Sequence, residues 1–501
     1  MDLKSQALEL VNNLNGRMGP SPYDIAWMAR VPADADGGPR WPELINWLTE
    51  HQWLDGSWGG SIRYYHDRIL CTLAAIIALK EHGTDHEITE AIERGERYIW
   101  HNLHRLRHDP FEMVGFELIL PTLLIEATDL GLDVPKHTCG YGRIRQEKLR
   151  LIPPKLLYSP KVTTVHSLEF LGKDGDSERM QQALAVNGSL GNSPATTSYY
   201  VLQGGDDDQA LAYLHAMLDH NGHVIYLHPF RAFELAWVLH SLSSCQEPLI
   251  NLVDDSVWKQ LQDNLGEYGT GLDPTFGIED SDTTSVTMLL LRLAGYSADP
   301  TILARFEDTE RHIFRTYDYE RNVSISTNIH ALEALSVLPN YPNREQSRDR
   351  ILALLLAHRT FDTYWVDKWH ASPYYATAHV LSGISKTAPR MLDECRRTVE
   401  WLTHTQREDG SWGFFDQGTA EETAYALTAL LHSSRRFPIN KDLFKQGADF
   451  LYREVAETTN RLEDYHYPPL WLGKPLYVPR DIVQASVLSA LILYEETFGS
   501  L

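Results

Sequence analysis

A pair of carboxylates, Asp280 and Asp282, lies directly before an apolar stretch with helical spacing and is the strongest candidate for acid–base chemistry. Residues i and i+2 of a helix point to different sides, so the two side chains can share one site only in a loop or at a helix start. Residues 283–285, Thr-Thr-Ser, are good capping residues. The pattern therefore predicts that both carboxylates stand at the N-terminus of a helix.

The surroundings expected for Asp282 favour an acid that keeps its proton at neutral pH. A neighbouring carboxylate and a dry site favour the protonated form, whereas the helix dipole favours the anion. An exposed Asp, with a pKa near ~3.9, would be ionised. The interpretation is an acid that holds its proton yet releases it readily. Two other Asp-x-Asp pairs, Asp34/Asp36 and Asp174/Asp176, lack this context and are expected to be solvated turns.

A segment dense in aromatic residues, residues 364–375, follows further along the chain. Aromatic faces stabilise positive charge without offering a nucleophile, although each aromatic residue alone is more often part of a core. His370, in the same segment, is either a proton acceptor or a core histidine with satisfied hydrogen bonds, and the second interpretation is favoured. The candidates for lining a cavity are Trp365, Trp369, Tyr374, Tyr375 and Phe414, with Tyr199, Tyr200, Phe415 and Trp471 as further sources.

The elements that position these side chains are predicted to be helices. Apolar residues recur at helical spacing, as in residues 88–99, and alternation with period two is scarce. Residues 47–59 and 401–413 form an internal repeat and read WLTEHQWLDGSWG and WLTHTQREDGSWG. Two copies so far apart indicate two duplicated helical domains, whose stacked helix pairs close into rings around a cavity. We expect a structural role for the repeat, with Gln bonding helix-end carbonyls and Trp covering the seam between helices.

Composition limits the function classes. The chain has 501 residues, enough for two or three domains, and a formal net charge of −23. Such an acidic chain is not expected to carry a broad nucleic-acid or anionic-lipid surface. Its four cysteines lie far apart, which indicates neither a disulfide framework nor a zinc site. The amphipathic N-terminal segment does not read as a signal peptide, and no apolar run reaches the ~18 residues of a membrane span, so a cytoplasmic protein is predicted.

The Gln-x-x-Asp-Gly-Ser-Trp-Gly segments resemble the QW motifs of the terpene cyclases, which include squalene–hopene cyclases and class II diterpene cyclases. Further similar segments are residues 20–31, 114–121, 233–237 and 471–477. A narrower likeness is to the bacterial subgroup of kolavenyl and halimadienyl (tuberculosinyl) diphosphate synthases. It is carried by residues 279–286, 324–330, 367–379 and 406–415. The resemblance therefore spans almost the whole chain.

The resemblance implies an all-α fold of two α/α-barrel domains, each a double ring of helices, in the βγ arrangement without a class I α domain. The β domain would comprise residues 1–20 and 246–501 and carry the acid motif. The γ domain, residues 21–245, would be inserted into it. The chain is shorter than a typical squalene cyclase.

The resemblance also implies catalytic roles. Class II cyclases protonate an alkene with the middle Asp of a DxDD motif, which places Asp282 as the acid, Asp280 as its neighbour and Thr283 in place of the last Asp. Asn328 corresponds to an Asn that hydrogen-bonds the acid in plant copalyl diphosphate synthases. We therefore expect Asn328 to orient the proton of Asp282; the alternative is a polar residue that caps the next helix.

The implied reaction is a protonation-initiated bicyclisation of geranylgeranyl diphosphate with hydride and methyl shifts. Kolavenyl diphosphate is the favoured product, and halimadienyl and copalyl diphosphate are alternatives. No DDxxD motif is present, because Asp206-Asp207-Asp208 lacks the final Asp, so the diphosphate should be retained. A class I terpene synthase, a methyltransferase or a phosphatase would act downstream.

A retained diphosphate needs cations. Lys148 lies in a stretch similar to a family segment whose Lys faces the diphosphate. Lys368 and Lys474 are further candidates, and the alternative for each is a simple surface charge. Family members use Mg²⁺, for which Glu112 is the candidate ligand here, although acidic residues are sparser in this region than in the plant enzymes.

Other function classes fit the sequence less well. A triterpene cyclase acting on squalene is disfavoured by the length of the chain and by the candidate diphosphate lysines. A non-catalytic helical-ring scaffold for a lipid or a protein would have no need of Asp280, Asp282 and Asn328 together. A prenyltransferase subunit would require a Cys-containing zinc trio, which the sequence does not supply.

Overall fold

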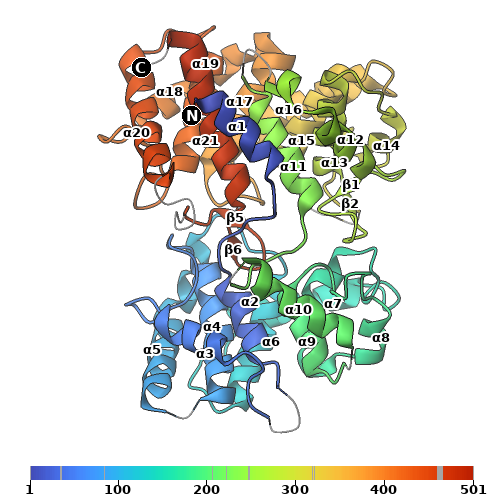
Figure 1. The fold of residues 1–501 in the computed structure, drawn as a ribbon, viewed down its shortest axis with the longest axis vertical. Helices are drawn as coiled ribbons and strands as arrows, with labels where there is room; N and C mark the ends of the chain where they lie inside the picture. The colour runs from blue at the N-terminus through green and yellow to red at the C-terminus, as the bar shows by residue number, and fades with distance from the viewer. Residues whose placement is uncertain are drawn as a thin grey trace.

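The computed structural model describes residues 2–33, 37–83, 85–205, 207–221, 223–245, 249–318, 320, 322–459 and 467–499. The pair Asp34/Asp36 and Asp206 lie outside these residues. Two helical bundles lie one above the other along the long axis of the molecule (Figure 1). The first and the last helix, α1 (Leu3–Asn12) and α21 (Arg480–Phe498), both belong to the upper bundle.

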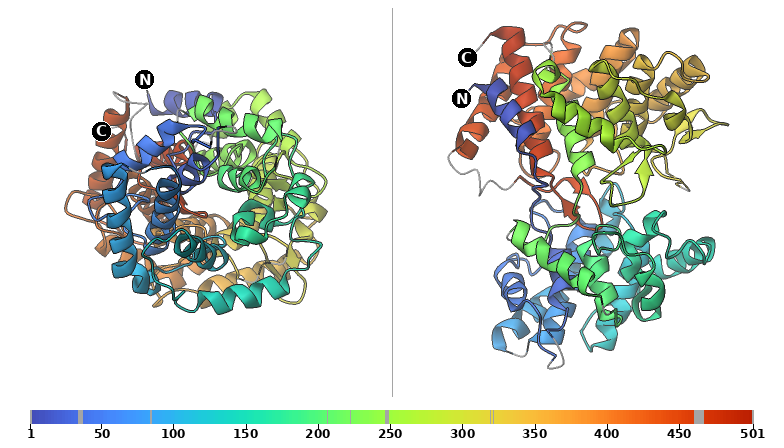
Figure 2. Two further views of the ribbon diagram at one scale, coloured as in Figure 1. Left: turned by 90° about the horizontal axis from the view of Figure 1, so that it is seen from below. Right: turned by 45° about the vertical axis from the view of Figure 1, so that its right-hand side comes forward.

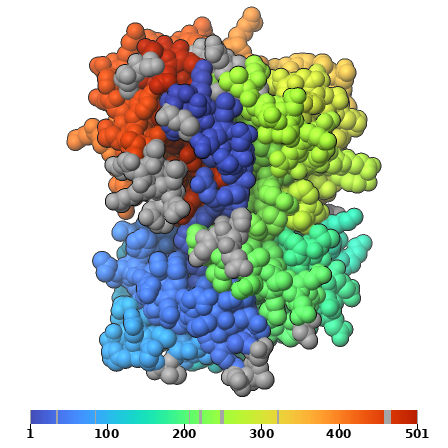
Figure 3. All heavy atoms as spheres, viewed as in Figure 1, coloured from blue at the N-terminus to red at the C-terminus, as the bar shows by residue number. Residues whose placement is uncertain are grey.

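The upper bundle contains a closed inner ring of helices, in which each member packs against the next and the last packs against the first. Its members are α11 (Arg231–Leu242), α13 (Ser281–Leu293), α15 (Ile325–Val337), α17 (Pro373–Thr387), α19 (Ala420–Ser433) and α21. An outer layer consists of α1, α12 (Asp255–Asn264), α14 (Pro300–Ala304), α16 (Arg344–Ala357), α18 (Arg396–His404) and α20 (Lys441–Thr459), with the 3₁₀ turns η3 (Leu249–Leu252) and η4 (Pro389–Cys395). Helix α1 covers the seam between α11 and α21 (Figure 3).

The lower bundle repeats this plan. Its inner ring consists of α2 (Pro22–Ala29), α4 (Tyr65–His82), α6 (Phe116–Asp129), η2 (Thr163–Asp174) and α9 (Pro194–Leu202). The outer layer consists of α3 (Pro42–Glu50), α5 (His86–Asn102), η1 (Leu103–His108), α7 (Tyr141–Leu151), α8 (Ser177–Gln181) and α10 (Asp208–Asn221). Along the long axis the helices are arranged around a centre (Figure 2). The predicted all-α fold of two double helical rings is confirmed.

Burial explains why the helices divide into two layers. Helix α4 is buried continuously from His66 to Leu79, as a helix covered on all sides must be. The outer helix α5 is buried along one stripe only, at Ile88, Ala91, Ile92, Gly95, Tyr98 and Ile99. The helical periodicity expected over residues 88–99 is therefore confirmed.

Three short antiparallel hairpins accompany the helices in the described residues. They are β1 (Thr270–Gly271) with β2 (Glu279–Asp280), β3 (Glu307–Asp308) with β4 (Ile313–Phe314), and β5 (Trp471–Leu472) with β6 (Leu476–Tyr477). The first hairpin pairs Asp280 with Thr270 and so fixes the residue before α13. The third lies between the two bundles (Figure 1). Over the described part of the chain, no helix has both the length and the apolar character needed to cross a membrane.

The repeated motifs have the structural role expected for them. The side-chain amide of Gln52 donates to the carbonyls of Gly56 and Ala91, both at 2.9 Å, and Gln406 makes the equivalent bonds to Gly410 and Leu443 at 3.0 Å. Trp58 and Trp412 are fully buried, and each indole N–H donates to the carbonyl ten residues earlier. These motifs lock consecutive helices together.

The boundary between the two domains differs from the expected one. Helix α11 lies within the range 21–245 assigned to the inserted domain, yet it packs against α13 and α21 in the upper ring. The upper ring therefore begins at Arg231, because the buried face of α11 closes the ring against α21.

Candidate active site

A cavity of about 790 Å³ lies between the two bundles, which is the size range of a small-molecule site. The lower bundle contributes apolar side chains from α6 and α7 and the segments that follow, and the upper bundle contributes the start of α13. The aromatic lining consists of Tyr226, Phe233, Trp237, Phe276, Tyr317, Trp369, Tyr375, Trp471 and Tyr477. Charged residues in the lining are Lys148, Asp280, Asp282, Asp318, Glu320 and Lys368.

The Thr-Thr-Ser run that is expected to cap the helix lies inside α13, and the N-cap is Asp280 instead. Its carboxylate accepts from the backbone N–H of Thr283 at 2.6 Å and from the Thr283 hydroxyl at 2.9 Å. These two hydrogen bonds from Thr283 fix the position of the Asp280 side chain. Burial raises the pKa of Asp280 to about 8, and the neighbouring Asp282 adds to this effect. Asp280 is therefore mostly neutral at pH 7.

Asp282 lies in the first turn of α13 and faces the cavity with 6% of its surface exposed. Its Oδ1 atom is 2.6 Å from Nδ1 of His330, a fully buried residue on α15. Burial alone lowers the pKa of His330, but the charge and hydrogen bond of Asp282 raise it, and the net direction is upward. The expected position of both carboxylates at a helix start is confirmed, and His330 is a partner of the acid that the sequence analysis did not name.

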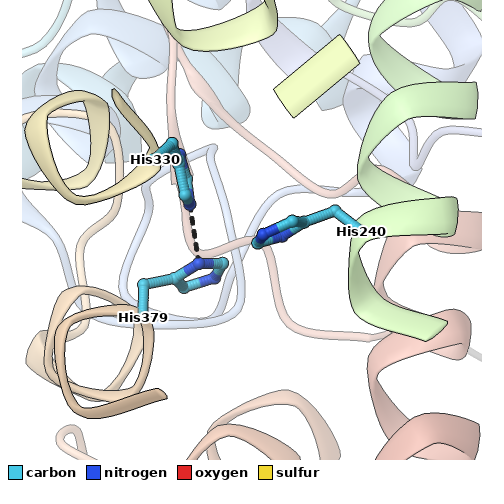
Figure 4. A group of neighbouring side chains, drawn as sticks. All are labelled: His240, His330 and His379. Carbon is cyan, nitrogen blue, oxygen red and sulfur yellow. Dashed lines mark hydrogen bonds between the residues drawn. The ribbon is translucent and has the colours of Figure 1, made fainter. Parts of the chain in front are cut away.

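His330 belongs to a group of three imidazoles from three inner helices, with His240 on α11 and His379 on α17 (Figure 4). Nε2 of His330 lies 2.8 Å from Nδ1 of His379. Nε2 of His240 instead pairs with Glu333 at 3.1 Å. Burial lowers the pKa of His240 and of His379, and the positive charge of His330 lowers both further. Asp282, His330 and His379 thus form one continuous chain of hydrogen bonds.

Asn328 does not contact Asp282. It is fully buried at the start of α15, where its Oδ1 accepts from the N–H of Phe314 at 2.9 Å. Its Nδ2 donates to the carbonyls of Phe314 and Ser324 at 3.0 and 2.8 Å. The expected role of orienting the acid is wrong for Asn328, because both polar atoms of its side chain hydrogen-bond to backbone groups. His330, two residues later, holds that position.

The aromatic candidates divide into two groups. Trp369 and Tyr375 line the cavity, as does Trp471. Among the described residues that line it, Trp365, Tyr374 and Phe414 do not appear. Trp365 is buried in a turn and donates to the carbonyl of Leu355, ten residues earlier, just as Trp58 and Trp412 do in their motifs. Tyr374 stacks on Trp401, and Phe414 is 44% exposed.

Other aromatic residues of the cavity were missed as site residues although their segments were noticed. Phe233 and Trp237 belong to α11, and Tyr477 ends the β5–β6 hairpin. The spacing of Phe233 and Trp237, one helical turn apart, was the available signal. His370 is a core histidine, as favoured: it is 1% exposed, stacks on Tyr375, and lies 3.2 Å from Glu421.

The three candidate lysines have different surroundings. Lys148 and Lys368 line the cavity, where they pair with Glu117 and Glu320. The side chain of Lys148 is 41% exposed, so it lies where the cavity meets solvent. Lys474 is fully buried between the bundles and donates to Glu169 at 2.7 Å, to the carbonyl of His166 and to two hydroxyls. Its four bonds make Lys474 a structural residue, contrary to the expected role in binding.

Glu112 is exposed and accepts from the Tyr141 hydroxyl at 2.9 Å, and it does not occur among the described residues of the cavity lining. Its place does not fit a metal ligand at this site. Asp318 and Glu320, which do line the cavity, offer the carboxylate oxygens that Mg²⁺ prefers. Glu320 lies beside Lys368 and accepts from the N–H of Thr316 at 2.7 Å.

The two double rings and the aromatic cavity with a buried carboxyl at a helix start define the class of the protein as a terpene cyclase. The squalene-hopene cyclase C-terminal domain matches residues 318–469. The chain belongs to the class II diterpene cyclases, because it is 33% identical to the "Type B diterpene cyclase" of Mycobacterium tuberculosis over 97% of both chains.

Two further proteins are similar over nearly their full length. The chain is 32% identical to the "Ent-copalyl diphosphate synthase" of a Streptomyces species, over 96% of this chain and 94% of that protein. The solved structure of ent-copalyl diphosphate synthase from Streptomyces platensis superimposes with a TM-score of 0.77 at 27% identity, over 98% of this chain and 99% of that one. Sequence and fold therefore agree on an enzyme that cyclises diterpenes.

Proposed function

We propose that the protein converts geranylgeranyl diphosphate into a rearranged bicyclic diterpenyl diphosphate, with Asp282 as the acid. The observation that carries this proposal is the polarity of the cavity. Asp282 is 6% exposed among aromatic side chains of the upper bundle, whereas the side chain of Lys148 on the lower bundle is 41% exposed. A substrate with a hydrocarbon tail and an anionic head matches this arrangement.

In the proposed first step, Asp282 gives its proton to the terminal alkene of the substrate. His330 donates a hydrogen bond to Oδ1, so the other carboxyl oxygen carries the proton that is transferred. The hydrogen bond from His330 strengthens the acid, because it favours the carboxylate that remains after the transfer. The new bond joins the proton to the terminal carbon, and positive charge then moves through the chain as two rings close.

The aromatic lining is suited to guide this charge. The faces of Trp237, Trp369, Tyr375 and Trp471 attract a carbocation and offer no nucleophile that would capture it. Asp280, mostly neutral at pH 7, adds no second full negative charge next to the acid. The reaction ends when the last carbocation loses a proton.

The diphosphate would lie at the mouth of the cavity, against Lys148 and Lys368. In the structure, Lys148 pairs with Glu117 and Lys368 pairs with Glu320. The anionic head group would compete with these two carboxylates for the lysine side chains. Mg²⁺, when bound, supplies positive charge to the diphosphate, and Asp318 and Glu320 are the residues that would hold it. The head group is retained, since no part of the proposed chemistry breaks its bond to carbon.

The product is proposed to be kolavenyl diphosphate, with halimadienyl and copalyl diphosphate as alternatives. These products differ in how many hydride and methyl shifts precede the loss of the proton. A product that keeps its diphosphate is a substrate for a further enzyme, for which a class I terpene synthase, a methyltransferase and a phosphatase are candidates. We also propose that the protein is located in the cytoplasm.

The test is to incubate purified protein with geranylgeranyl diphosphate and Mg²⁺, remove the phosphates from the product, and identify the alcohol by mass spectrometry and NMR. A bicyclic alcohol is expected, with no stoichiometric inorganic pyrophosphate released before dephosphorylation. Release of pyrophosphate during turnover, or recovery of unchanged geranylgeraniol alone, would contradict the proposal. The variant Asp282→Asn, which keeps the size of the side chain, serves as the inactive control.

A further inference from the structure

We propose that His379 and His330 form a proton relay that recharges Asp282 after each turnover from a second, smaller cavity. The inference rests on the proposed role of Asp282 as the acid. Each turnover takes one proton from Asp282 and releases one from the last carbocation. Without a supply of protons the buried acid would act only once.

The geometry of the relay is a chain of two short hydrogen bonds. Oδ1 of Asp282 lies 2.6 Å from Nδ1 of His330, and Nε2 of His330 lies 2.8 Å from Nδ1 of His379. His330 is fully buried, so both of its ring nitrogens are used in these bonds. Figure 4 shows the imidazoles of His330 and His379 meeting from two different helices, α15 and α17.

The relay joins two separate cavities. Asp282 lines the large cavity, whereas His379 lines a small one of about 40 Å³ together with Glu333 and Lys386. Within the described residues, neither lining includes His330, which therefore bridges the two. The side chain of Lys386 is 34% exposed, so the small cavity borders solvent there.

The proton moves by transfers that leave all heavy-atom bonds unchanged. With Asp282 ionised, Nδ1–H of His330 points to the carboxylate, and Nε2 of His330 accepts from Nδ1–H of His379. A proton from water binds Nε2 of His379, the Nδ1 proton of His379 moves to His330, and the Nδ1 proton of His330 moves to Asp282. One proton enters and one reaches the acid. The proton arrives on Oδ1 of Asp282. Rotation of the carboxyl group then carries it to the oxygen that faces the substrate, and rotation of the two imidazole rings restores their Nδ1–H bonds before the next turnover.

The charges around the relay support this direction of transfer. Burial and the charge of His330 lower the pKa of His379, so His379 does not retain a proton. The net direction of the pKa of His330 is upward because of Asp282. Glu333 and Lys386 are the other charged groups near this end, and they pair with each other at 3.5 Å. The lowered pKa of His379 and the raised pKa of His330 therefore favour transfer of a proton from His379 to His330.

A separate route has a chemical advantage. Water that entered the large cavity to recharge Asp282 would also be a nucleophile beside a carbocation, and closed sites prevent such side reactions by excluding water. The small cavity allows proton supply while the aromatic cavity stays dry.

The test compares the first turnover with the steady state in His379→Asn. The amide N–H of Asn can still donate to Nε2 of His330, but an amide cannot pass a proton on. With enzyme in excess over geranylgeranyl diphosphate, we expect a single-turnover rate within about threefold of wild type. With substrate in excess, we expect a burst of one product per enzyme, then a steady-state rate lower by about 10-fold or more. His240→Gln, which keeps a donor for Glu333 in the same cluster, is the matched control and should show no burst.

Two outcomes would overturn the relay. One is a steady-state rate like that of wild type in His379→Asn; the other is an equal loss in both rates, which would mean that His379 only holds His330 in place. If His379→Asn unfolds at lower temperature, His379→Gly with added imidazole replaces it, and imidazole must restore the steady-state rate selectively. The first turnover reports cyclisation and the ratio of the two rates reports recharging, so failure of the proposed function is distinguishable from failure of the relay.

Discussion

Nδ1 of His330 lies 2.6 Å from Oδ1 of Asp282, although the two residues are 48 positions apart in the sequence. The contact joins the first turn of α13 to the middle of α15, two neighbours in the inner ring. Because both side chains are buried, the pair is shielded from bulk water. The proposed acid, Asp282, therefore acts together with His330 as a hydrogen-bonded pair.

Replacing Asp282 should abolish catalysis while substrate still binds. In Asp282→Asn and Asp282→Ala we expect turnover to fall by about 10³-fold or more, because the variants lose the proton donor. Asp280, the neighbouring carboxyl group, is held by Thr283 as the N-cap of α13. Binding of geranylgeranyl diphosphate, measured by equilibrium titration, should change little, since the head group is proposed to bind at Lys148 and Lys368. Near-wild-type product formation by either purified variant would refute the assignment of the acid.

The pH dependence of the wild-type rate should report His330. The charge of Asp282 raises the pKa of His330, so the Asp282–His330 pair keeps one shared proton to a higher pH than a free histidine would. We expect kcat to fall as pH rises through that raised pKa. In His330→Gln, kcat should be lower by about 100-fold and this limb of the profile should vanish. An unchanged profile in the variant would show that His330 does not assist the acid.

Stability should decrease with pH because of Asp280. Its pKa is about 8 in the folded protein, against ~3.9 for an unfolded Asp, so the folded state binds more protons between these values. The free energy of unfolding from this group therefore falls as pH rises from about 4 to 8. Asp280→Asn keeps the N-cap and removes the charge, so its stability relative to wild type should rise over that window by roughly a few kcal/mol.

Denaturant titrations of both proteins at several pH values measure this difference. Asp308→Asn is a suitable contrast, because hydrogen bonding to Arg315 lowers the pKa of Asp308 even though its burial acts in the opposite direction. A constant difference between Asp280→Asn and wild type from pH 5 to pH 8 would contradict the expectation for Asp280.

The lysines should separate binding from stability. Lys148→Ala removes a cation at the mouth of the cavity and should raise KM by about 10-fold, with little change in thermal stability. Lys474→Ala leaves Glu169 buried without its cationic partner and should cost about 3–5 kcal/mol of unfolding free energy. Steady-state kinetics and denaturant titration of both variants check the pair. A raised KM with unchanged stability in Lys474→Ala would instead show that Lys474 binds the substrate.

Much of the fold was predictable from the sequence because its signals are local. Helical spacing and the two Gln-x-x-Asp-Gly-Ser-Trp-Gly motifs identified stacked helices, and the Thr-Thr-Ser run placed Asp280 and Asp282 at a helix start. These features depend on neighbours within a few residues. The boundary at α11 was less predictable, because it depends on packing against α21, far along the chain.

The site was predictable only where a side chain's direction was fixed locally. Asn328 and His330 lie two positions apart on one helix and so face different sides, and the sequence does not say which side meets α13. Trp365 and Trp369 share one aromatic segment, yet the first fills a turn and the second lines the cavity. Trp365 takes the place of the motif tryptophans without the Gln-x-x-Asp-Gly signature, so its structural role had no visible signal.

The closed upper ring has a consequence for biosynthesis of the protein. Helix α11 emerges from the ribosome near the middle of the chain, but its partner α21 follows every other member of the ring. Lys474 of the β5–β6 hairpin reaches Glu169 of the lower bundle late in translation, and the upper ring closes only after α21 arrives. Such long-range pairing delays folding. The surroundings of Asp282 are therefore completed only after α21 has left the ribosome and packed against α11 and α19.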